Sequence, residues 1–218
     1  MRVMKCSTQS PFTHNNTLMN LVIATKNAGK IGEIRSMLEL PAEFEISSLL
    51  DYDNTPDVIE DGSSFHENAG KKAEAAAAHL GVPALADDSG IMIDALGGGP
   101  GVHSARYGGL HLSDGERNLL VLSRMRGVPP ERRTARFVCV IAVALPDGTA
   151  RFAEGECEGV IADEPRGVNG FGYDPIFLVP GLNRTMAELS PMEKNSISHR
   201  ARALVKAREI LYGLLPPR

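Results

Sequence analysis

The chain has 218 residues, of which 43% are hydrophobic and 23% charged, and its formal net charge is -4. This composition is ordinary for a globular protein with a sizeable core, and the acidic balance argues against a broad nucleic-acid-binding surface. The three cysteines, Cys6, Cys139 and Cys157, lack CxxC spacing. Their arrangement argues against a zinc site or a disulfide scaffold and favours a cytoplasmic protein.

The first 18 residues are polar and lack the apolar centre of a signal peptide, and no later apolar run is long enough to cross a membrane. Two interpretations of this leader stay open: translation starts at Met19, or residues 1–18 form a disordered extension. In both cases we expect no membrane partner.

Residues 20–25, NLVIAT, form a short apolar run that predicts a buried strand. A helix is predicted directly after the turn KNAGK, because apolar residues recur at helical spacing from Ile31 to Leu38. Pro41 should end this helix.

A strand that leads directly into a helix points backbone N–H groups and the positive end of the helix dipole at any anion above the strand. Thr25, Asn27 and Lys30 would add a hydroxyl, an amide and a charge. The segment is not a Walker loop, which needs glycine at Ala24 and serine or threonine at Ile31. The structural alternative is that Asn27 caps the helix and Lys30 is solvated.

Residues 42–62 are predicted to be a strand and an acidic loop that is mostly solvated. A capping box of Ser64 and Glu67 then predicts the start of an alanine-rich helix that ends at Gly81. Because capping already accounts for Glu67, Glu60 ranks above it as a candidate metal ligand.

Residues 84–86 form an apolar run that predicts the end of a buried strand, and Asp87 and Asp88 follow directly. Buried carboxylates are costly without a partner, and a divalent metal that serves phosphates is the leading candidate. The glycine run at 97–101 predicts a loop whose backbone approaches a ligand closely. Polar and basic side chains come next: His103, Ser104, Arg106 and Tyr107.

Ser113 and Glu116 predict the capping box of a further helix that ends at Gly127. Residues 134–145 and 149–157 are β-rich runs joined by the turn PDG, which is the best hairpin signal in the chain. Because a hairpin pairs antiparallel strands, we expect a mixed sheet.

Residues 167–177, GVNGFGYDPIF, interrupt the periodicity with glycines around aromatic residues. Two interpretations fit such a loop, a ligand contact or a turn packed by its own aromatic side chains.

The last helix is predicted to begin at Ser196 or Ser198 and to run through Leu211, which gathers three cations or potential cations near its N-terminus: Lys194, His199 and Arg200. Cations there oppose the helix dipole unless an anion lies among them. The structural alternative is an ordinary surface His-Arg pair.

Five motifs occur in this order: ATKNAGK; FHENA; ADDSG with GGGPGVHSARYGG; GFGYDPIF; and AELSPMEKNSISHRARAL. Together they resemble the inosine and xanthosine triphosphate pyrophosphatases, which remove non-canonical purine nucleotides. The resemblance extends from Met19 to Leu211. It implies an α/β fold in which residues 19–218 form one domain of two lobes, with a long mixed sheet flanked by helices and a cleft between the lobes. It also implies a homodimer, Mg²⁺, and hydrolysis of ITP, dITP and XTP to the monophosphate and pyrophosphate.

By the same resemblance, the triphosphate would lie against Thr25, Lys26, Asn27, Ala28, Gly29 and Lys30. Asp88 would be the catalytic base and a metal ligand, with Glu60 as a second metal carboxylate. Asp87 would assist catalysis by orienting Asp88 or Lys30. The remaining substrate contacts would be Ser89, Phe171, Gly172, Tyr173, Asp174, Lys194, His199 and Arg200, of which the last two complete the base pocket.

Two alternatives stay open. A Maf-like pyrophosphatase of modified pyrimidine nucleotides shares the first motif, although Ser198–Arg200 and the FGYD loop favour purines. A nucleotide-sensing domain without turnover would keep the pocket, although the presence of both Asp87 and Asp88 argues against it.

Overall fold

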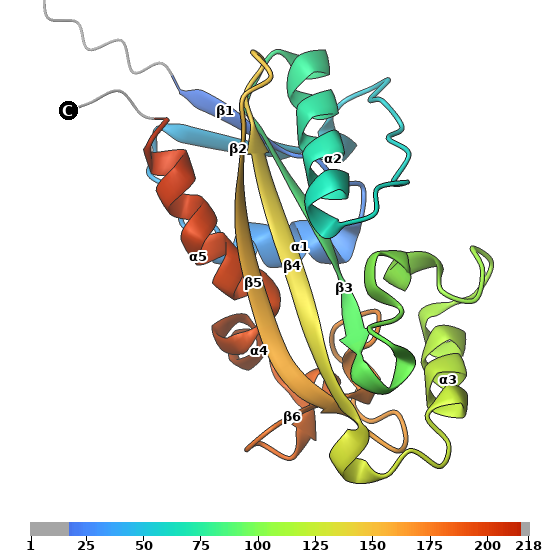
Figure 1. Ribbon diagram of the computed structural model, residues 1–218. Coiled ribbons are helices and arrows are strands. Elements are labelled where there is room, and N and C mark those ends of the chain that lie inside the picture. Colours follow the sequence, from blue (N-terminus) through green and yellow to red (C-terminus); the bar gives the residue numbers. More distant parts are fainter. Residues whose placement is uncertain (1–17, 215–218) are drawn as a thin grey trace, which may run out of the picture.

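The computed structural model describes residues 18–214 and contains a curled seven-stranded sheet (Figure 1). The strands follow the order β2-β1-β3-β4-β5-β6-β7. Their bounds are β1 (Met19–Ile23), β2 (Phe44–Ser48), β3 (Ala84–Ile93), β4 (Thr134–Ala144), β5 (Ala150–Ile161), β6 (Phe177–Val179) and β7 (Arg184–Thr185). β1 is parallel to β2 and β3, and the later pairs are antiparallel, which confirms the mixed sheet. Apart from Leu18, the predicted N-terminal extension lies outside the described residues.

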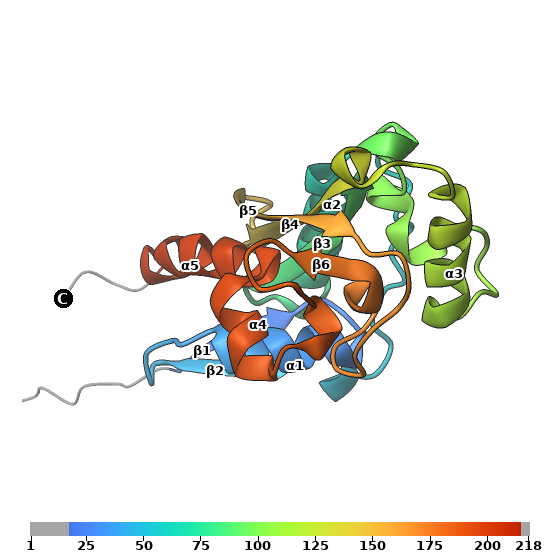
Figure 2. The ribbon, with the colours of Figure 1, turned by 90° about the horizontal axis from the view of Figure 1, so that it is seen from below.

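Helices cover both faces of the sheet, as Figure 2 shows. Their bounds are α1 (Ala28–Met37), α2 (Phe65–Leu80), α3 (Asp114–Arg124), α4 (Pro191–Ile197) and α5 (His199–Tyr212). α2 packs over β3 and β4 on one face, and α1 and α5 lie on the other. β1, β2 and α2 gather at one end of the long strands, and β6 and α3 lie at the other end (Figure 1). These two ends are the lobes, and the α/β fold class is confirmed. Within the described residues, no helix is long and apolar enough to cross a membrane.

β3 is longer than predicted. It continues past Ala86 to Ile93 because all ten of its residues pair with β4. Its pairing with β1 covers Ala84 and Leu85, so β3 projects beyond the carboxyl end of β1. The two aspartates therefore lie within the strand and not after its end. Because successive side chains of a strand point to opposite faces, Asp87 faces α1 and α5 while Asp88 faces α2.

The helix boundaries follow local capping chemistry. α1 ends at Met37, ahead of Pro41. At α2, Ser64 accepts the N–H of Glu67 as predicted, but the Glu67 carboxylate accepts from the N–H of Ser63, so the capping box is only half formed. The α3 capping box forms in full, and the β4–β5 hairpin forms across the PDG turn.

The C-terminal helical region contains two helices where the sequence predicted one. α4 begins with a capping box of Ser190 and Glu193, with Pro191 as its first residue. Ser198 ends α4 and accepts the N–H of Ala201 at 3.2 Å, so Ser198 is the cap of α5 and the alternative cap was wrong.

Candidate active site

A cavity of about 240 Å³ opens beyond the carboxyl end of β1, where β3 continues without that neighbour. Its walls come from the turn before α1, from α2, from β3, from the 101–105 segment, from the FGYD loop and from the start of α5. Twelve predicted residues line it: Thr25, Asn27, Lys30, Glu60, Asp88, Ser89, Phe171, Gly172, Tyr173, Asp174, His199 and Arg200. Segments far apart in the sequence therefore meet at one site.

The turn between β1 and α1 forms one wall of this cavity. Asn27 caps α1 by accepting the N–H of Lys30 at 3.0 Å. The Lys30 side chain is 16% exposed and forms an ion pair with Asp87, so the alternative of a solvated Lys30 was wrong. Lys26 lines a second cavity beside the first and pairs with Asp57 at 3.0 Å.

Gly29 lies against the Phe171 ring. A Cβ added at Gly29 would meet the Cδ1 atom of the ring at 2.9 Å. A side chain here would displace the ring, so this glycine allows the start of α1 and the FGYD loop to touch.

Asp88 and Glu60 share the ammonium of Lys72, which reaches them from α2. The Nζ atom lies 3.1 Å from Asp88 Oδ1 and 3.2 Å from Glu60 Oε1. Asp88 Oδ2 is buried and has no partner among the described residues. Burial raises the pKa of Asp88 and nearby Glu60 raises it further, while Lys72 and Lys30 oppose the shift. Burial therefore makes this carboxylate a stronger base than an exposed aspartate.

Small residues on α2 make this contact possible. Ala69, Ala73, Ala76 and Ala77 are buried against alanines of β3 and β4. Small side chains let the helix approach the sheet closely, so Lys72, whose side chain is 12% exposed, reaches Asp88 on the face of β3 that α2 covers. The sequence signal for this contact is a lysine between alanine positions that are buried, and it was not among the predicted site residues.

Asp87 lies beneath the cavity in a dense set of polar contacts. Its carboxylate pairs with Lys30 and with Arg200 Nε at 2.9 Å. It also accepts from Ser89 Oγ at 3.0 Å and Cys139 Sγ at 3.0 Å. Although burial opposes ionisation, the Arg200 guanidinium and Lys30 hold the pKa of Asp87 well below its ordinary value. These contacts hold Asp87 against Lys30, Arg200 and Ser89. Its orienting role in catalysis stays a prediction.

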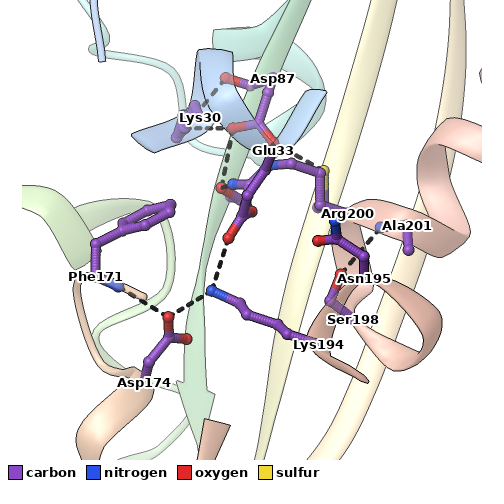
Figure 3. A network of polar contacts seen from close by, with 12 residues as sticks. Lys30, Glu33, Asp87, Phe171, Asp174, Lys194, Asn195, Ser198, Arg200 and Ala201 are labelled. Atoms are coloured by element: carbon purple, nitrogen blue, oxygen red, sulfur yellow. Dashed lines mark hydrogen bonds and ion pairs between the residues drawn. The ribbon is translucent and has the colours of Figure 1, made fainter. Parts of the chain in front are cut away.

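A second acidic residue, Glu33 on α1, joins Arg200 to Lys194 (Figure 3). Its carboxylate accepts from Lys194 Nζ at 2.7 Å and forms an ion pair with the Arg200 guanidinium. Lys194 also contacts Asp174 Oδ2 at 2.5 Å, and that oxygen accepts the N–H of Phe171 at 2.9 Å. The sequence predicts the helix that carries Glu33, but no motif singles out this residue.

The Phe171 ring closes the cavity on the side of these cations. Lys194 Nζ lies 4.9 Å and Arg200 Cζ 5.6 Å from the ring centroid. His199 stacks on Phe137 with centroids 4.8 Å apart, and burial with the nearby Arg200 charge lowers the pKa of His199 well below its ordinary value. The His-Arg pair is thus buried, and the surface alternative was wrong.

The described residues contain no group of three or more His, Cys, Asp or Glu side chains that could hold a metal ion. A pair of carboxylates, Asp88 and Glu60, does meet at the cavity through Lys72. Magnesium in nucleotide enzymes is usually held by one or two carboxylates together with phosphate oxygens and water. The unpartnered Oδ2 of Asp88 and the neighbouring Glu60 carboxylate fit such an ion, beside the Lys72 ammonium that pairs with Asp88 Oδ1.

The sequence matches the Ham1 family over residues 21–210. The chain belongs to the Ham1 family. A protein named dITP/XTP pyrophosphatase from Shouchella clausii is 54% identical over 196 residues, which is 90% of this chain and 98% of that protein. One of the same name from Geobacillus kaustophilus is 53% identical over 88% of this chain and 94% of its own length. The fold matches the structure of a HAM1 protein from Coxiella burnetii with a TM-score of 0.81 and 44% identity, covering 89% of this chain and 99% of that one.

Proposed function

We propose that this Ham1 protein hydrolyses non-canonical purine nucleoside triphosphates, namely ITP, dITP and XTP, to the nucleoside monophosphate and pyrophosphate. The observation that carries the proposal is the order of groups along one cavity. Carboxylates and the Lys72 ammonium lie on its α2 side, the N-terminus of α1 lies beside them, and an aromatic ring with buried cations lies on the α5 side. A triphosphate joined to a purine needs these groups in that order. The names of the relatives support the same substrates.

Asp88 is the proposed general base. It would take a proton from water as the water oxygen bonds to the α-phosphorus and the bond to the bridging oxygen breaks, which releases pyrophosphate. Lys72 and Lys30 are placed to offset the charge of the phosphates, as positioned cations do in phosphoryl transfer. Burial helps because a carboxylate with a raised pKa holds the transferred proton better.

Mg²⁺ is the proposed cofactor, held by Asp88 and Glu60. When bound, it supplies charge neutralisation and orientation of the phosphate oxygens.

Base selection is proposed to follow from buried hydrogen-bond donors. Lys194 lines a neighbouring cavity that shares Phe171 with the active-site cavity, and it uses two of its three N–H groups on Glu33 and Asp174, which leaves one for the edge of a base. Hypoxanthine and xanthine present an acceptor oxygen at C6, whereas adenine presents an amine there. An adenine would leave a buried donor facing another donor, which is a costly mismatch in a dry site.

A cytoplasmic homodimer is the remaining part of the proposal. The thiols of Cys139 and Cys157 are free and buried, which suits a reducing compartment. Light scattering of the purified full-length chain tests the dimer, and a monomeric mass contradicts it.

A pyrophosphate-release assay across a nucleotide panel, with and without Mg²⁺, tests the function. We expect release from ITP, dITP and XTP that depends on the metal and far exceeds release from ATP. The panel should include 5-methyl-UTP, because its preferred turnover would support a Maf-like pyrophosphatase. Binding of ITP without any turnover would support the sensing domain.

A further inference from the structure

α3 holds Gly172, the second residue of the FGYD motif, by both of its main-chain polar groups. The Gly172 N–H donates to Asp114 Oδ2 at 2.8 Å, and the Gly172 carbonyl accepts from Asn118 Nδ2 at 3.0 Å. Asp114 is the first residue of α3 and Asn118 lies four residues later, so both side chains leave the same face of the helix. Nothing in the sequence motifs pointed to these two residues.

These bonds hold the backbone just after Phe171, and Asp174 holds the backbone N–H of Phe171 itself. Asp174 Oδ2 accepts the N–H of Phe171 at 2.9 Å, while Asp114 accepts the next N–H along the chain. Gly172 has a φ of 61°, and a Cβ there would meet no atom within 4 Å. Glycine is therefore needed for the left-handed backbone and not for space. With both flanking N–H groups anchored, the direction of the Phe171 ring is set by the loop.

Asparagine at position 118 is unfavourable for stability, because the position is buried and lies within α3. It is 3% exposed, and its Oδ1 atom has no partner within residues 18–214. A buried amide with an unmet acceptor is unfavourable, and asparagine is a poor helix former. Its bond to Gly172 is the contact that an apolar residue of similar size could not replace.

α3 is a rigid platform for this contact. Arg117 donates to the carbonyls of Tyr107, Gly109 and Leu112, which ties the preceding loop to the helix. Val121 is fully buried in the core of this lobe. Because α3 is held this firmly, its polar side chains can impose a position on the FGYD loop.

We propose that Asp114 and Asn118 are positioning residues for nucleotide binding, which hold Gly172 so that the Phe171 ring is presented to the purine base. The inference rests on the proposed function, because it takes a purine nucleotide as the ligand. Asp114 itself lines the cavity, so direct contact between its carboxylate and the ligand is the competing explanation.

A double-mutant cycle separates the two explanations. Asn118→Ala and Asp114→Ala are each made in the parent and in Phe171→Ala, and kcat and KM for ITP are measured. In the parent, we expect each change to raise KM about 3- to 10-fold, the loss typical of one hydrogen bond, with kcat within about 2-fold. With Phe171→Ala the same changes should alter KM less than about 2-fold, because the group they position is gone. Glu116→Gln is the matched control: it weakens the α3 cap at Ser113 without touching Gly172, and should leave KM unchanged.

A binding readout that needs no turnover complements the kinetics. The chain has no tryptophan, so Phe171→Trp supplies a single fluorescent reporter at the base site. IMP should quench it, and Asn118→Ala should weaken IMP binding about 3- to 10-fold in that background. If Asn118→Ala fails to fold, Asp114→Ala carries the test, because the Asp114 side chain is 58% exposed.

Three results would overturn the inference. One is a rise in KM that persists in Phe171→Ala, which would indicate direct contact or general damage. Another is an unchanged KM and an unchanged IMP affinity in both variants. The third is a parent protein that neither turns over ITP nor binds IMP, which would overturn the proposed function and this inference with it. This failure can be told apart from the first two results, because both of those require an active parent.

Discussion

Neighbouring aspartates in β3 should respond to the same substitution in opposite ways. Asp87→Asn removes a fully buried carboxylate that pairs with Lys30 and Arg200. Asp88→Asn removes a carboxylate whose charge is opposed by burial and which shares Lys72 with Glu60. We expect the first change to damage the fold and the second to damage the chemistry.

The structure sets the size of the difference. Removing one partner of a buried ion pair leaves the other charge uncompensated and typically costs about 3–5 kcal/mol. Arg200 is 1% exposed, so Asp87→Asn should lose stability in this range, although Glu33 remains as a second partner. Asp88→Asn removes both the cost of burying the Asp88 charge and the attraction of that charge to Lys72. The free energy of unfolding should therefore change by less than about 1 kcal/mol.

The pH dependence follows from the signs of the two pKa shifts. The pKa of Asp87 is lowered in the fold, so its contribution is fully present above the unfolded value of about 3.9 and is lost as pH falls through the folded pKa. The difference in stability between the parent and Asp87→Asn should therefore be full at pH 7 and shrink below about pH 4. The pKa of Asp88 is raised, so its charge costs stability above the unfolded value, and that cost is relieved as pH falls.

Urea denaturation from pH 3 to 8, with pyrophosphate release from ITP at pH 7, measures both effects. Asp61→Asn is the control, because Asp61 pairs with Lys71 at the surface and should leave stability and activity near the parent values. An Asp87→Asn protein as stable as the parent would refute the structural role of Asp87. An Asp88→Asn protein that retains ITP hydrolysis would refute the catalytic role of Asp88.

The remaining predictions concern other parts of the chain. Lys72→Met should lower kcat on ITP about 100-fold or more by removing a positioned cation. It should also move the acidic limb of the pH–rate profile upward, because Lys72 lowers the pKa of Asp88; an unmoved limb would contradict the assignment. Ser198→Ala should cost about 1 kcal/mol in urea denaturation through the lost α5 cap, whereas Ser196→Ala should not, and equal losses would place the cap wrongly. Deletion of residues 1–18 should leave kcat/KM for ITP unchanged, and a large loss would give that segment a role.

Local signals were enough to predict most elements. The caps at Asn27, Ser64 and Ser113 and the hairpin turn depend on residues within a few positions, so the sequence specifies them directly. The Ser190 capping box was equally local and was overlooked. The length of β3 could not be predicted in this way, because its second half is held by pairing with β4, some fifty positions away along the chain, as the register of Asp87 with Ile141 shows.

The same distinction between local signals and long-range contacts applies to the residues of the candidate site. Asp88, Lys30 and Phe171 belong to short motifs and were found from the sequence. Lys72 and Glu33 lie on helices whose facing direction depends on packing against the sheet, and Asn118 acts through a loop 54 positions later. Such residues emerge from the fold because their partners are distant in sequence.

The most direct measurement is the identity of the products formed from ITP. Chromatography of a reaction with the full-length protein and Mg²⁺ should show IMP and pyrophosphate in equal amounts, with neither formed by Asp88→Asn. IDP with inorganic phosphate as the products, or unchanged product formation by Asp88→Asn, would contradict the proposed cleavage between the α and β phosphates with Asp88 as the base.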